Sequence, residues 1–467
     1  MKKNINDFRQ YIKGKNVAVL GIGISNTPLI KYLSKLDARI TAFDRAEPEK
    51  ISDRLAELKG LDVKLSLGEN YLNGLKGFDI IFKTPVIRPD IPELLAEKER
   101  GAVITSEMEV FLELCPAETF GITGSDGKTT TTTLIYNMLK EQGYRCWVGG
   151  NIGTPLLDRI EEILPTDKVV VELSSFQLMT MKISPDIAVL TNISPNHLDV
   201  HKSMEEYIDA KKNIFKFQGA GGKAIFNFDN EITRNLGKEN RSRTYYFSRL
   251  ADIPVGACLE GDNIVIKDGG QVRHIMKIGD ILLPGVHNVE NYLGAILAVA
   301  DYVSPETMKK VAETFRGVEH RIEFVREVSQ VSFYNDSIGS SPSRTIASVN
   351  AFSKKVILIT GGYDKGIPYD TMGSLIIEKV KGLVLMGKTG PKIHAALEDE
   401  IRKTGKGKDI PVFFAGNMEE AVSKAYEMAL PGDTVILSPA SASFDMYRNF
   451  EERGNHFKAI VNTLRKK

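Results

Sequence analysis

The chain has 467 residues, 42% of them hydrophobic and 26% charged, which is enough for about three globular domains of roughly 150 residues each. The formal net charge of +1 gives no support to a nucleic-acid or acidic-membrane partner, and no apolar run approaches the roughly 18 residues that a membrane span needs. Three scattered cysteines without CxxC spacing argue against a disulfide framework or a zinc site and favour a cytoplasmic protein. The basic N-terminal stretch lacks an apolar core, so we expect no signal peptide.

The first 105 or so residues predict a sheet of parallel strands. Continuous apolar runs at 16–24 and 39–44 are typical of buried parallel strands, and the stretch between them has helical spacing. The turn after the first strand reads GxGxxN, with Gly21, Gly23 and Asn26, and Asp44 ends the second strand. Because asparagine replaces the third glycine of the dinucleotide fingerprint, three interpretations stay open: an NAD site, a tight turn, and a site for another nucleotide-type ligand such as a UDP group.

A glycine-rich loop follows the strand predicted at 118–124, and a helix is expected to begin near Thr129. Backbone N–H groups of such a loop can wrap phosphate oxygens, and the helix N-terminus adds partial positive charge. Lys128 supplies a cation for the phosphates, and the Thr129 hydroxyl is a ligand for Mg²⁺. The strict P-loop pattern needs glycine where Ile122 stands, so a purely structural strand–helix turn is the alternative. The predicted ATP-binding residues of the loop are Gly124, Ser125, Asp126, Gly127, Lys128, Thr129 and Thr130.

Glu172 ends the next predicted strand, within KVVVELSS. A carboxylate at that place can hold Mg²⁺ directly or through water, and the alternative is a satisfied polar residue at a strand end. Because a Mg–ATP site needs an acidic partner, the glycine-rich loop favours the metal role.

The segment TNISPNHLDVHKS places His197, Asp199 and His201 at alternate positions. An HxDxH pattern can indicate a transition-metal site, but we favour a strand-end His197 that faces the nucleotide, with the other two as ordinary loop residues. In the helix predicted shortly afterwards, the neighbours Lys211 and Lys212 would by themselves indicate a solvated pair.

The remaining sequence predicts a mixed layer and then a third α/β region. Short strands with turn signals between residues 222 and 285 predict a small, mostly antiparallel layer, and 287–303 has the apolar spacing of a helix. From about Val318 onward, strands alternate with amphipathic helices, which implies a largely parallel sheet. The predicted fold is therefore α/β with a Rossmann-like N-terminal domain, a central P-loop ATPase-like domain that carries the antiparallel layer, and a doubly wound C-terminal domain. The predicted boundaries are 1–106, 107–317 and 318–467.

Segments spread over the whole chain resemble the Mur ligase family. In order they are GITGSDGKTT, GGNIGTPL, VVELSSFQL, NISPNHLD, EEYIDAKKNIF, LPGVHNVENYLGA, GVEHRIEF, YNDSIGSSP, ITGGYDK and LSPASASFDMYRNFEERGNHF. The first three mark the superfamily, and the last is similar to its D-glutamate-adding branch. The resemblance implies an ATP-dependent ligase that adds D-glutamate to UDP-N-acetylmuramoyl-L-alanine in peptidoglycan precursor synthesis. In that reaction ATP phosphorylates a carboxylate to an acyl phosphate, which the incoming amine attacks.

The resemblance also implies roles for residues at the family's motif positions. Glu172 matches a ligand of the nucleotide Mg²⁺ and His197 a ligand of a second Mg²⁺, while Lys211 matches a lysine that family members carry as a carbamate. The last match replaces the solvated interpretation of Lys211. The implied catalytic residues are Lys128, His197, Lys211 and Arg321, and the implied metal ligands are Thr129, Glu172, His197 and Lys211. Asn288 and Asn291 match residues on the adenine side of the nucleotide. Arg321 and Asp336 match residues that reach the nucleotide after domain closure. For Arg321, a surface ion pair is the alternative interpretation.

Two further sets of residues match the family's substrate positions. For the UDP-linked substrate they are Ile24, Ser25, Asp44, Arg45, Thr84, Pro85, Asn151, Ser174 and Gln177. For D-glutamate they are Ser340, Lys365, Ser443, Phe444 and Phe450, with core packing as the alternative for the two phenylalanines. One departure is notable: NDSIGS has Ile338 and Ser340 where many members have lysine and threonine. Arg344, one helical turn beyond Ser340, is a candidate replacement for the missing charge.

Three other function classes compete with this interpretation. Another amide ligase of the superfamily is the first, but the UDP-type first domain argues against folylpolyglutamate synthase, and SPASASFD argues against the diaminopimelate- and lysine-adding ligases. A non-catalytic nucleotide switch would leave three sets of ligand residues unexplained, and an NAD oxidoreductase would need the imperfect fingerprint to bind NAD. We expect a monomer whose partners are UDP-N-acetylmuramoyl-L-alanine, D-glutamate and ATP with two Mg²⁺ ions, without nucleic acid and without membrane insertion.

Overall fold

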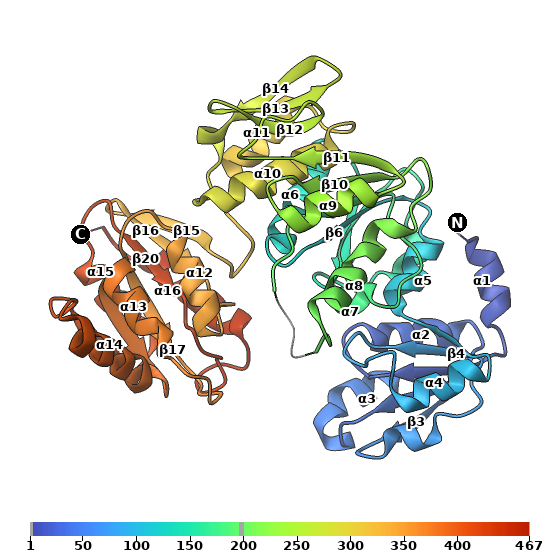
Figure 1. The fold of residues 1–467 in the computed structure, drawn as a ribbon. Helices are drawn as coiled ribbons and strands as arrows, with labels where there is room; N and C mark the ends of the chain where they lie inside the picture. The colour runs from blue at the N-terminus through green and yellow to red at the C-terminus, as the bar shows by residue number, and fades with distance from the viewer. Residues whose placement is uncertain (1–2, 196–199, 467) are drawn as a thin grey trace. The chain divides into compact units, whose positions relative to one another are not determined.

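The computed structural model describes residues 3–195 and 200–466 and contains three β-sheets (Figure 1). The chain packs into two compact units: one holds the chain up to Asp280 together with Val289–Val311, and the other holds Ile281–Asn288 and the chain from Ala312. Two of the sheets belong to the first unit and the third belongs to the second. In the described ranges no helix is long and apolar enough to cross a membrane. Each predicted domain contains one sheet, whereas the exact boundaries at 106 and 317 stay predictions.

The amino-terminal sheet is parallel throughout, as the apolar runs predicted. Its strands lie in the order β3 (Val63–Leu67), β2 (Arg39–Asp44), β1 (Asn16–Leu20), β4 (Ile80–Lys83), β5 (Val103–Thr105). Its helices are α1 (Ile5–Ile12), α2 (Asn26–Lys35), α3 (Ser52–Leu58) and α4 (Pro92–Glu99), with short 3₁₀ turns at Pro48–Ile51 and Tyr71–Gly74. The next helix, α5 (Glu107–Leu114), packs against the 3₁₀ turn at Leu157–Glu162 of the central region. The order of connections reverses between β1 and β4, and ligands of such sheets bind outside the carboxyl ends of the strands at this point.

The central sheet has nine strands and carries the glycine-rich loop. Their order is β14 (Gln271–Lys277), β13 (Asn263–Asp268), β12 (Gly256–Glu260), β11 (Arg243–Phe247), β10 (Lys223–Asn227), β9 (Ile187–Leu190), β6 (Glu118–Thr123), β8 (Lys168–Glu172), β7 (Cys146–Gly150). Its helices are α6 (Lys128–Glu141), α7 (Ser175–Leu178), α8 (Met204–Lys216), α9 (Glu231–Glu239), α10 (Val286–Val299) and α11 (Pro305–Thr314), with 3₁₀ turns at Leu157–Glu162 and Ile278–Asp280.

The predicted antiparallel layer is only partly correct. β10 and β11 pair in parallel with β9 and with each other and so extend the central sheet, whereas β12, β13 and β14 pair antiparallel. The error has a physical cause: α9 forms the crossover between β10 and β11, which parallel pairing requires and which local turn signals do not reveal. β12 joins the parallel and antiparallel parts by pairing in parallel with β11.

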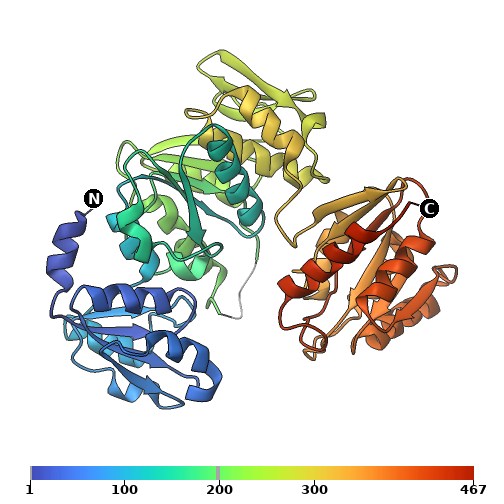
Figure 2. The same ribbon diagram turned by 180° about the vertical axis from the view of Figure 1, so that it is seen from behind.

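The third sheet is the framework of the second unit. Its strands lie in the order β15 (Glu323–Val328), β16 (Val331–Asn335), β20 (Thr434–Leu437), β17 (Val356–Gly361), β18 (Val380–Met386), β19 (Val412–Ala415), and only β15 is antiparallel to its neighbour. Its helices are α12 (Pro342–Asn350), α13 (Thr371–Lys379), α14 (Gly390–Thr404), α15 (Met418–Met428) and α16 (Phe450–Thr463). Separate apolar cores lie on its two faces, one under α12, α13 and α14 and one under α15 and α16, so the sheet is covered on both sides (Figure 2).

Candidate functional site

The glycine-rich loop joins β6 to α6, and α6 begins at Lys128, one residue before the predicted start. Gly127 is the N-cap in the left-handed region, with φ of 78°, and a Cβ at this position would collide with Oδ1 of Asn291. Only glycine therefore fits this point of the loop. The Lys128 side chain folds back so that Nζ donates to the carbonyl oxygens of Gly124 at 2.9 Å and Ser125 at 2.8 Å. The loop thus presents a helix N-terminus and a lysine at one place, which is the arrangement that binds phosphate.

Polar side chains that follow β9 hold the loop in this shape. Thr191 Oγ1 donates to the carbonyl oxygen of Asp126 at 2.5 Å, and Asn192 Oδ1 accepts from the Asp126 N–H at 3.0 Å. The Ser125 hydroxyl donates to the carbonyl oxygen of Ser194 at 2.9 Å. No role was predicted for Thr191, Asn192 or Ser194, although their position directly after β9, a strand adjacent to β6, is a signal that could have identified them.

Glu172 lies at the carboxyl end of β8, which pairs directly with β6. Its side chain is buried, and Oε1 accepts from Nδ2 of Asn151 at 2.7 Å. The other carboxylate oxygen, Oε2, is also buried and has no hydrogen-bond partner in the described part of the chain. A buried carboxylate oxygen without a partner is costly, and a divalent cation is a ligand that would satisfy it. The residues present therefore fit Mg²⁺ at this position.

The structure separates the two neighbouring lysines of α8. Lys211 is 1% exposed, and its Nζ donates to the Gly124 carbonyl oxygen at 2.8 Å and lies 3.3 Å from Oγ1 of Thr123. Burial lowers the pKa of Lys211 well below its ordinary value, and the charge of Lys128 lowers it further. Lys212, in contrast, forms a surface ion pair with Glu239 at 3.0 Å. The solvated interpretation holds for Lys212 and is wrong for Lys211, because consecutive helical residues lie on different faces.

The histidine segment is only partly described. His197 and Asp199 lie outside the described residues, so their predicted roles stay predictions. His201 is buried rather than an ordinary loop residue: its Nε2 is 2.9 Å from Oγ of Ser175, and its ring stacks on Phe176 with centroids 5.2 Å apart. These contacts give His201 a packing role beside α7.

The two asparagines predicted to contact the adenine lie near the start of α10. Asn291 Oδ1 is 3.3 Å from Oγ1 of Thr131, in the first turn of α6, and it covers Gly127. Asn288 Nδ2 donates to the carbonyl oxygen of Pro284 at 2.7 Å. The structure therefore brings Asn291 to the glycine-rich loop.

Residues predicted to hold the UDP group surround the reversal point of the amino-terminal sheet. Asp44 accepts from the N–H groups of Ile22 at 2.7 Å and Ala46 at 2.8 Å, so its carboxylate ties the ends of β1 and β2 together. Asn26 Nδ2 donates to the carbonyl oxygens of Leu20 and Gly21, both at 3.0 Å, which explains why asparagine can replace the third glycine. Of the other predicted residues here, Ile24, Ser25 and Arg45 are exposed and Thr84 and Pro85 are half-buried.

Three residues predicted to hold the rest of the UDP-linked substrate already contact protein groups. Ser174 and Gln177 form a capping box at the start of α7, in which the serine accepts from the Gln177 N–H and Gln177 Oε1 accepts from the Ser174 N–H. Asn151 donates to Glu172. Their first role is to shape the carboxyl end of the central sheet.

In the second unit, a strained turn carries Arg321. Its two neighbours, His320 and Ile322, have positive φ of 63° and 45°, which costs roughly 1–3 kcal/mol each and is rare for a β-branched residue. The Ile322 N–H donates to Oδ1 of Asp336 at 3.3 Å, and Ser438 Oγ donates to Oδ2 at 2.7 Å. Burial raises the pKa of Asp336 to about 6. Asp336 therefore holds the turn that presents Arg321.

The residues predicted for D-glutamate follow three adjacent parallel strands, β16, β20 and β17. Lys365 is exposed and Ser443 is buried. Phe444 is 61% exposed and packs edge-to-face on Tyr363 with centroids 5.9 Å apart, so the core-packing alternative is wrong for Phe444. Phe450 is half-buried at the start of α16, and Ser340 is half-buried after β16.

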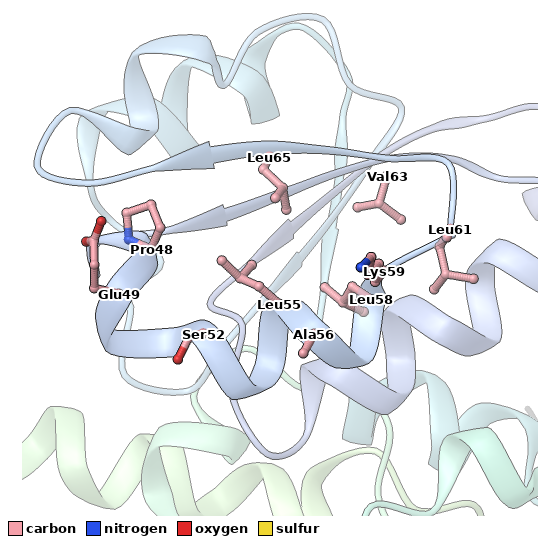
Figure 3. Close-up of a pocket in the computed structure, with 11 residues that line it drawn as sticks. Pro48, Glu49, Ser52, Leu55, Ala56, Leu58, Lys59, Leu61, Val63 and Leu65 are labelled. Atoms are coloured by element: carbon pink, nitrogen blue, oxygen red, sulfur yellow. The ribbon is translucent and has the colours of Figure 1, made fainter.

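An apolar pocket of about 590 Å³ lies elsewhere, between α3 and β3 at the edge of the amino-terminal sheet (Figure 3). It is lined by Pro48, Glu49, Ser52, Leu55, Ala56, Leu58, Lys59, Gly60, Leu61, Val63 and Leu65. None of the predicted site residues is among them, so this pocket is separate from the candidate site.

Comparison with known proteins decides the family. Residues 122–299 match the Mur ligase middle domain, and residues 320–441 match the glutamate ligase domain of Mur ligases. The chain is 63% identical over 464 residues to the UDP-N-acetylmuramoylalanine–D-glutamate ligase of Acetivibrio thermocellus, covering 99% of this chain and 100% of the relative. The chain belongs to the Mur ligase family.

A second relative and two solved structures are also similar to this chain. The enzyme of the same name from Ruminiclostridium cellulolyticum is 55% identical over 465 residues, which cover all of both chains. Among solved structures, UDP-N-acetylmuramate–alanine ligase from Thermotoga maritima matches with a TM-score of 0.58 at 19% identity, over 96% of this chain and 99% of that chain. A pseudomurein peptide ligase from Methanothermus fervidus matches with a TM-score of 0.51 at 17% identity, over 96% of this chain and 99% of that chain. These structures share the fold and confirm the predicted α/β class.

Proposed function

We propose that the protein is an ATP-dependent ligase that joins D-glutamate to UDP-N-acetylmuramoyl-L-alanine in peptidoglycan precursor synthesis. The observation that carries this proposal is the 63% identity, over essentially the full length of both chains, to a ligase named for that reaction. The test is whether phosphate release from ATP requires both the UDP-linked substrate and D-glutamate. No observation favours a sister ligase or a nucleotide switch over this activity.

The glycine-rich loop provides the phosphate-binding half of the reaction. N–H groups at the start of α6 and Nζ of Lys128 would surround the transferred phosphoryl group, where they oppose its negative charge. Asn291 and Asn288 would lie on the adenine side. Arg321 would reach the γ-phosphate on domain closure, and Asp336 supports this role by holding the turn that carries Arg321.

We propose that the site binds two Mg²⁺ ions. Their ligands would be Thr129, Glu172, His197 and a carbamate on Lys211. Bound Mg²⁺ would neutralise phosphate charge and orient the phosphates. The orphaned Oε2 of Glu172 supports the metal at this position.

The environment of Lys211 supports the carbamate. CO₂ reacts with a neutral amine and not with an ammonium ion, and the lowered pKa of Lys211 increases the neutral fraction. The ammonium first loses one proton, and the neutral amine then forms an N–C bond to CO₂ and loses a second proton. A buried cation thereby becomes an anion, which removes the repulsion from Lys128.

The proposed substrate residues follow the carboxyl ends of strands in all three sheets. We propose that Ile24, Ser25, Asp44, Arg45, Thr84 and Pro85 hold the UDP group and that Asn151, Ser174 and Gln177 contact the muramoyl–alanine arm. D-Glutamate would contact Ser340, Lys365, Ser443, Phe444 and Phe450.

The three cysteines form no disulfide in the described ranges, which supports the proposed cytoplasmic location.

Replacing Lys365 with alanine is expected to raise the KM for D-glutamate about tenfold or more, because the exposed ammonium would lose a charge-assisted contact to a substrate carboxylate. The KM for ATP should change by less than about twofold. Steady-state kinetics with each substrate varied in turn measure both values, with Lys406→Ala, another exposed lysine of this unit, as the matched control. An equal rise in both KM values would contradict the assignment of Lys365.

A further inference from the structure

Arg344 and Arg321 are linked through one backbone residue. Arg344 stands in the first turn of α12, and its Nη1 donates to the carbonyl oxygen of Ile338 at 3.4 Å. The N–H of the same Ile338 donates to the carbonyl oxygen of His320 at 3.1 Å, directly before Arg321. Ile338 therefore connects the first turn of α12 to the residue before Arg321, and the charges of the two arginines act on each other.

The positive charges of Arg321 and Arg344 are not balanced by nearby carboxylates in the described part of the chain. Neither guanidinium group forms an ion pair with a carboxylate within the described ranges. The carboxylate that acts on both is Asp336, but its oxygens already accept from Ser438 Oγ and the Ile322 N–H. Partial burial lowers the pKa of Arg344, and the charge of Arg321 lowers it further, so the two cations repel each other. A second anion at this place would relieve the repulsion.

The backbone on both sides of Arg321 is strained. Arg321 stands between two residues with positive φ, one of them the β-branched Ile322, and Asp336 and the Ile338 N–H fix the turn from both sides. Backbone strain of this kind persists where the surroundings over-determine it, and it clusters at ligand-binding positions. A simple surface arginine needs no such support.

We propose that Arg344 binds substrate directly and forms with Arg321 a two-guanidinium site for one oxyanion, a carboxylate or a phosphoryl group. Guanidinium is suited to this because its planar donors match both groups with two parallel hydrogen bonds. Arg344 stands in the first turn of α12, and the N-terminus of that helix adds partial positive charge near the site. The assignment of this anion to a ligase substrate rests on the proposed function.

Kinetics of Arg344→Ala tests the site. We expect the KM of one anionic substrate to rise about tenfold or more, with the KM of the UDP-linked substrate changed less than about twofold. A rise for ATP identifies a phosphoryl group, and a rise for D-glutamate identifies a carboxylate. Arg344→Lys should recover part of the loss, because it keeps the charge but not the planar fork. The matched control is Arg402→Ala, whose exposed side chain in α14 forms an ion pair with its neighbour Asp399.

A double-mutant cycle separates binding from structural support. If both arginines hold the same anion, the losses in Arg321→Ala and Arg344→Ala should combine to less than their product. Multiplicative losses, or an Arg344→Ala enzyme that equals Arg402→Ala for every substrate, would overturn the proposal. If Arg344→Ala does not fold, Arg344→Lys carries the same comparison.

The site can also be tested apart from the ligase activity. If the wild-type protein shows no amine-dependent phosphate release, the proposed function fails. Anion binding then tests whether Arg344 and Arg321 form a site. Inorganic phosphate and glutarate are titrated during thermal unfolding of wild type and Arg344→Ala, and at least one of them should raise the Tm of wild type more. Equal stabilisation of both proteins by both anions would overturn the arginine site.

Discussion

Replacing Lys128 with alanine is expected to lower kcat for phosphate release by about 10³-fold. The lysine is held over the glycine-rich loop by the carbonyl oxygens of Gly124 and Ser125, so its charge stands where the transferred phosphoryl group would bind. Its loss removes an interaction that matters most in the transition state, when charge moves onto the transferred and leaving oxygens. Steady-state phosphate release measures the effect.

Lys140→Ala is the matched control for this prediction. Lys140 lies in the last turn of the same helix, is exposed, and stacks over Tyr136 at 5.7 Å, far along α6 from the loop. We expect near-normal kcat for this variant and a similar Tm for both. If Lys128→Ala turned over like Lys140→Ala, the assignment of the loop to phosphate binding would be wrong.

Replacing Lys211 with alanine should lower kcat by about 10²-fold or more, because the site would lose the carbamate that we propose as a ligand of Mg²⁺. The variant should be partly rescued by formate or acetate, whose carboxylate can occupy the space of the missing side chain. Raising bicarbonate should increase wild-type activity in CO₂-depleted buffer and leave the variant unchanged. Phosphate release with and without these additions measures all three effects.

The adjacent lysine provides the control. Lys212 belongs to the same helix but pairs with Glu239 and Asp209 on the surface, so Lys212→Ala should stay within about threefold of wild type. Rescue should also be absent in Lys212→Ala. A Lys211→Ala enzyme with wild-type kcat, or one that short carboxylates do not help, would contradict the carbamate.

Motifs that combine local pattern with strand position were predictable from the sequence. The strand, glycine-rich loop and helix at 118–141 follow from apolar continuity and from glycine spacing, and the structure confirms them. The distinction between Lys211 and Lys212 was different, because helical spacing alone cannot say which of two neighbours faces the core. The family resemblance supplied that choice, and the burial of Lys211 confirms it.

Other features depend on contacts between distant segments and could not be predicted. Parallel pairing of β10 and β11 depends on the crossover through α9, which local turn signals conceal. The strained turn at Arg321 is set by Asp336 and Ile338, and nothing local in GVEHRIEF indicates positive φ at His320 or Ile322. Arg344 was a candidate only because a charge is missing at Ile338, and its hydrogen bond to the Ile338 carbonyl oxygen depends on the folded chain.

The most direct test of the account is phosphate release with ATP, Mg²⁺ and UDP-N-acetylmuramoyl-L-alanine, in parallel with D-glutamate, L-glutamate, L-lysine or meso-diaminopimelate. The account predicts release with D-glutamate only. Release with another amine would keep the ligase chemistry but contradict the D-glutamate branch. Absence of any amine-dependent release would contradict the ligase itself and leave the glycine-rich loop as part of a nucleotide-binding switch.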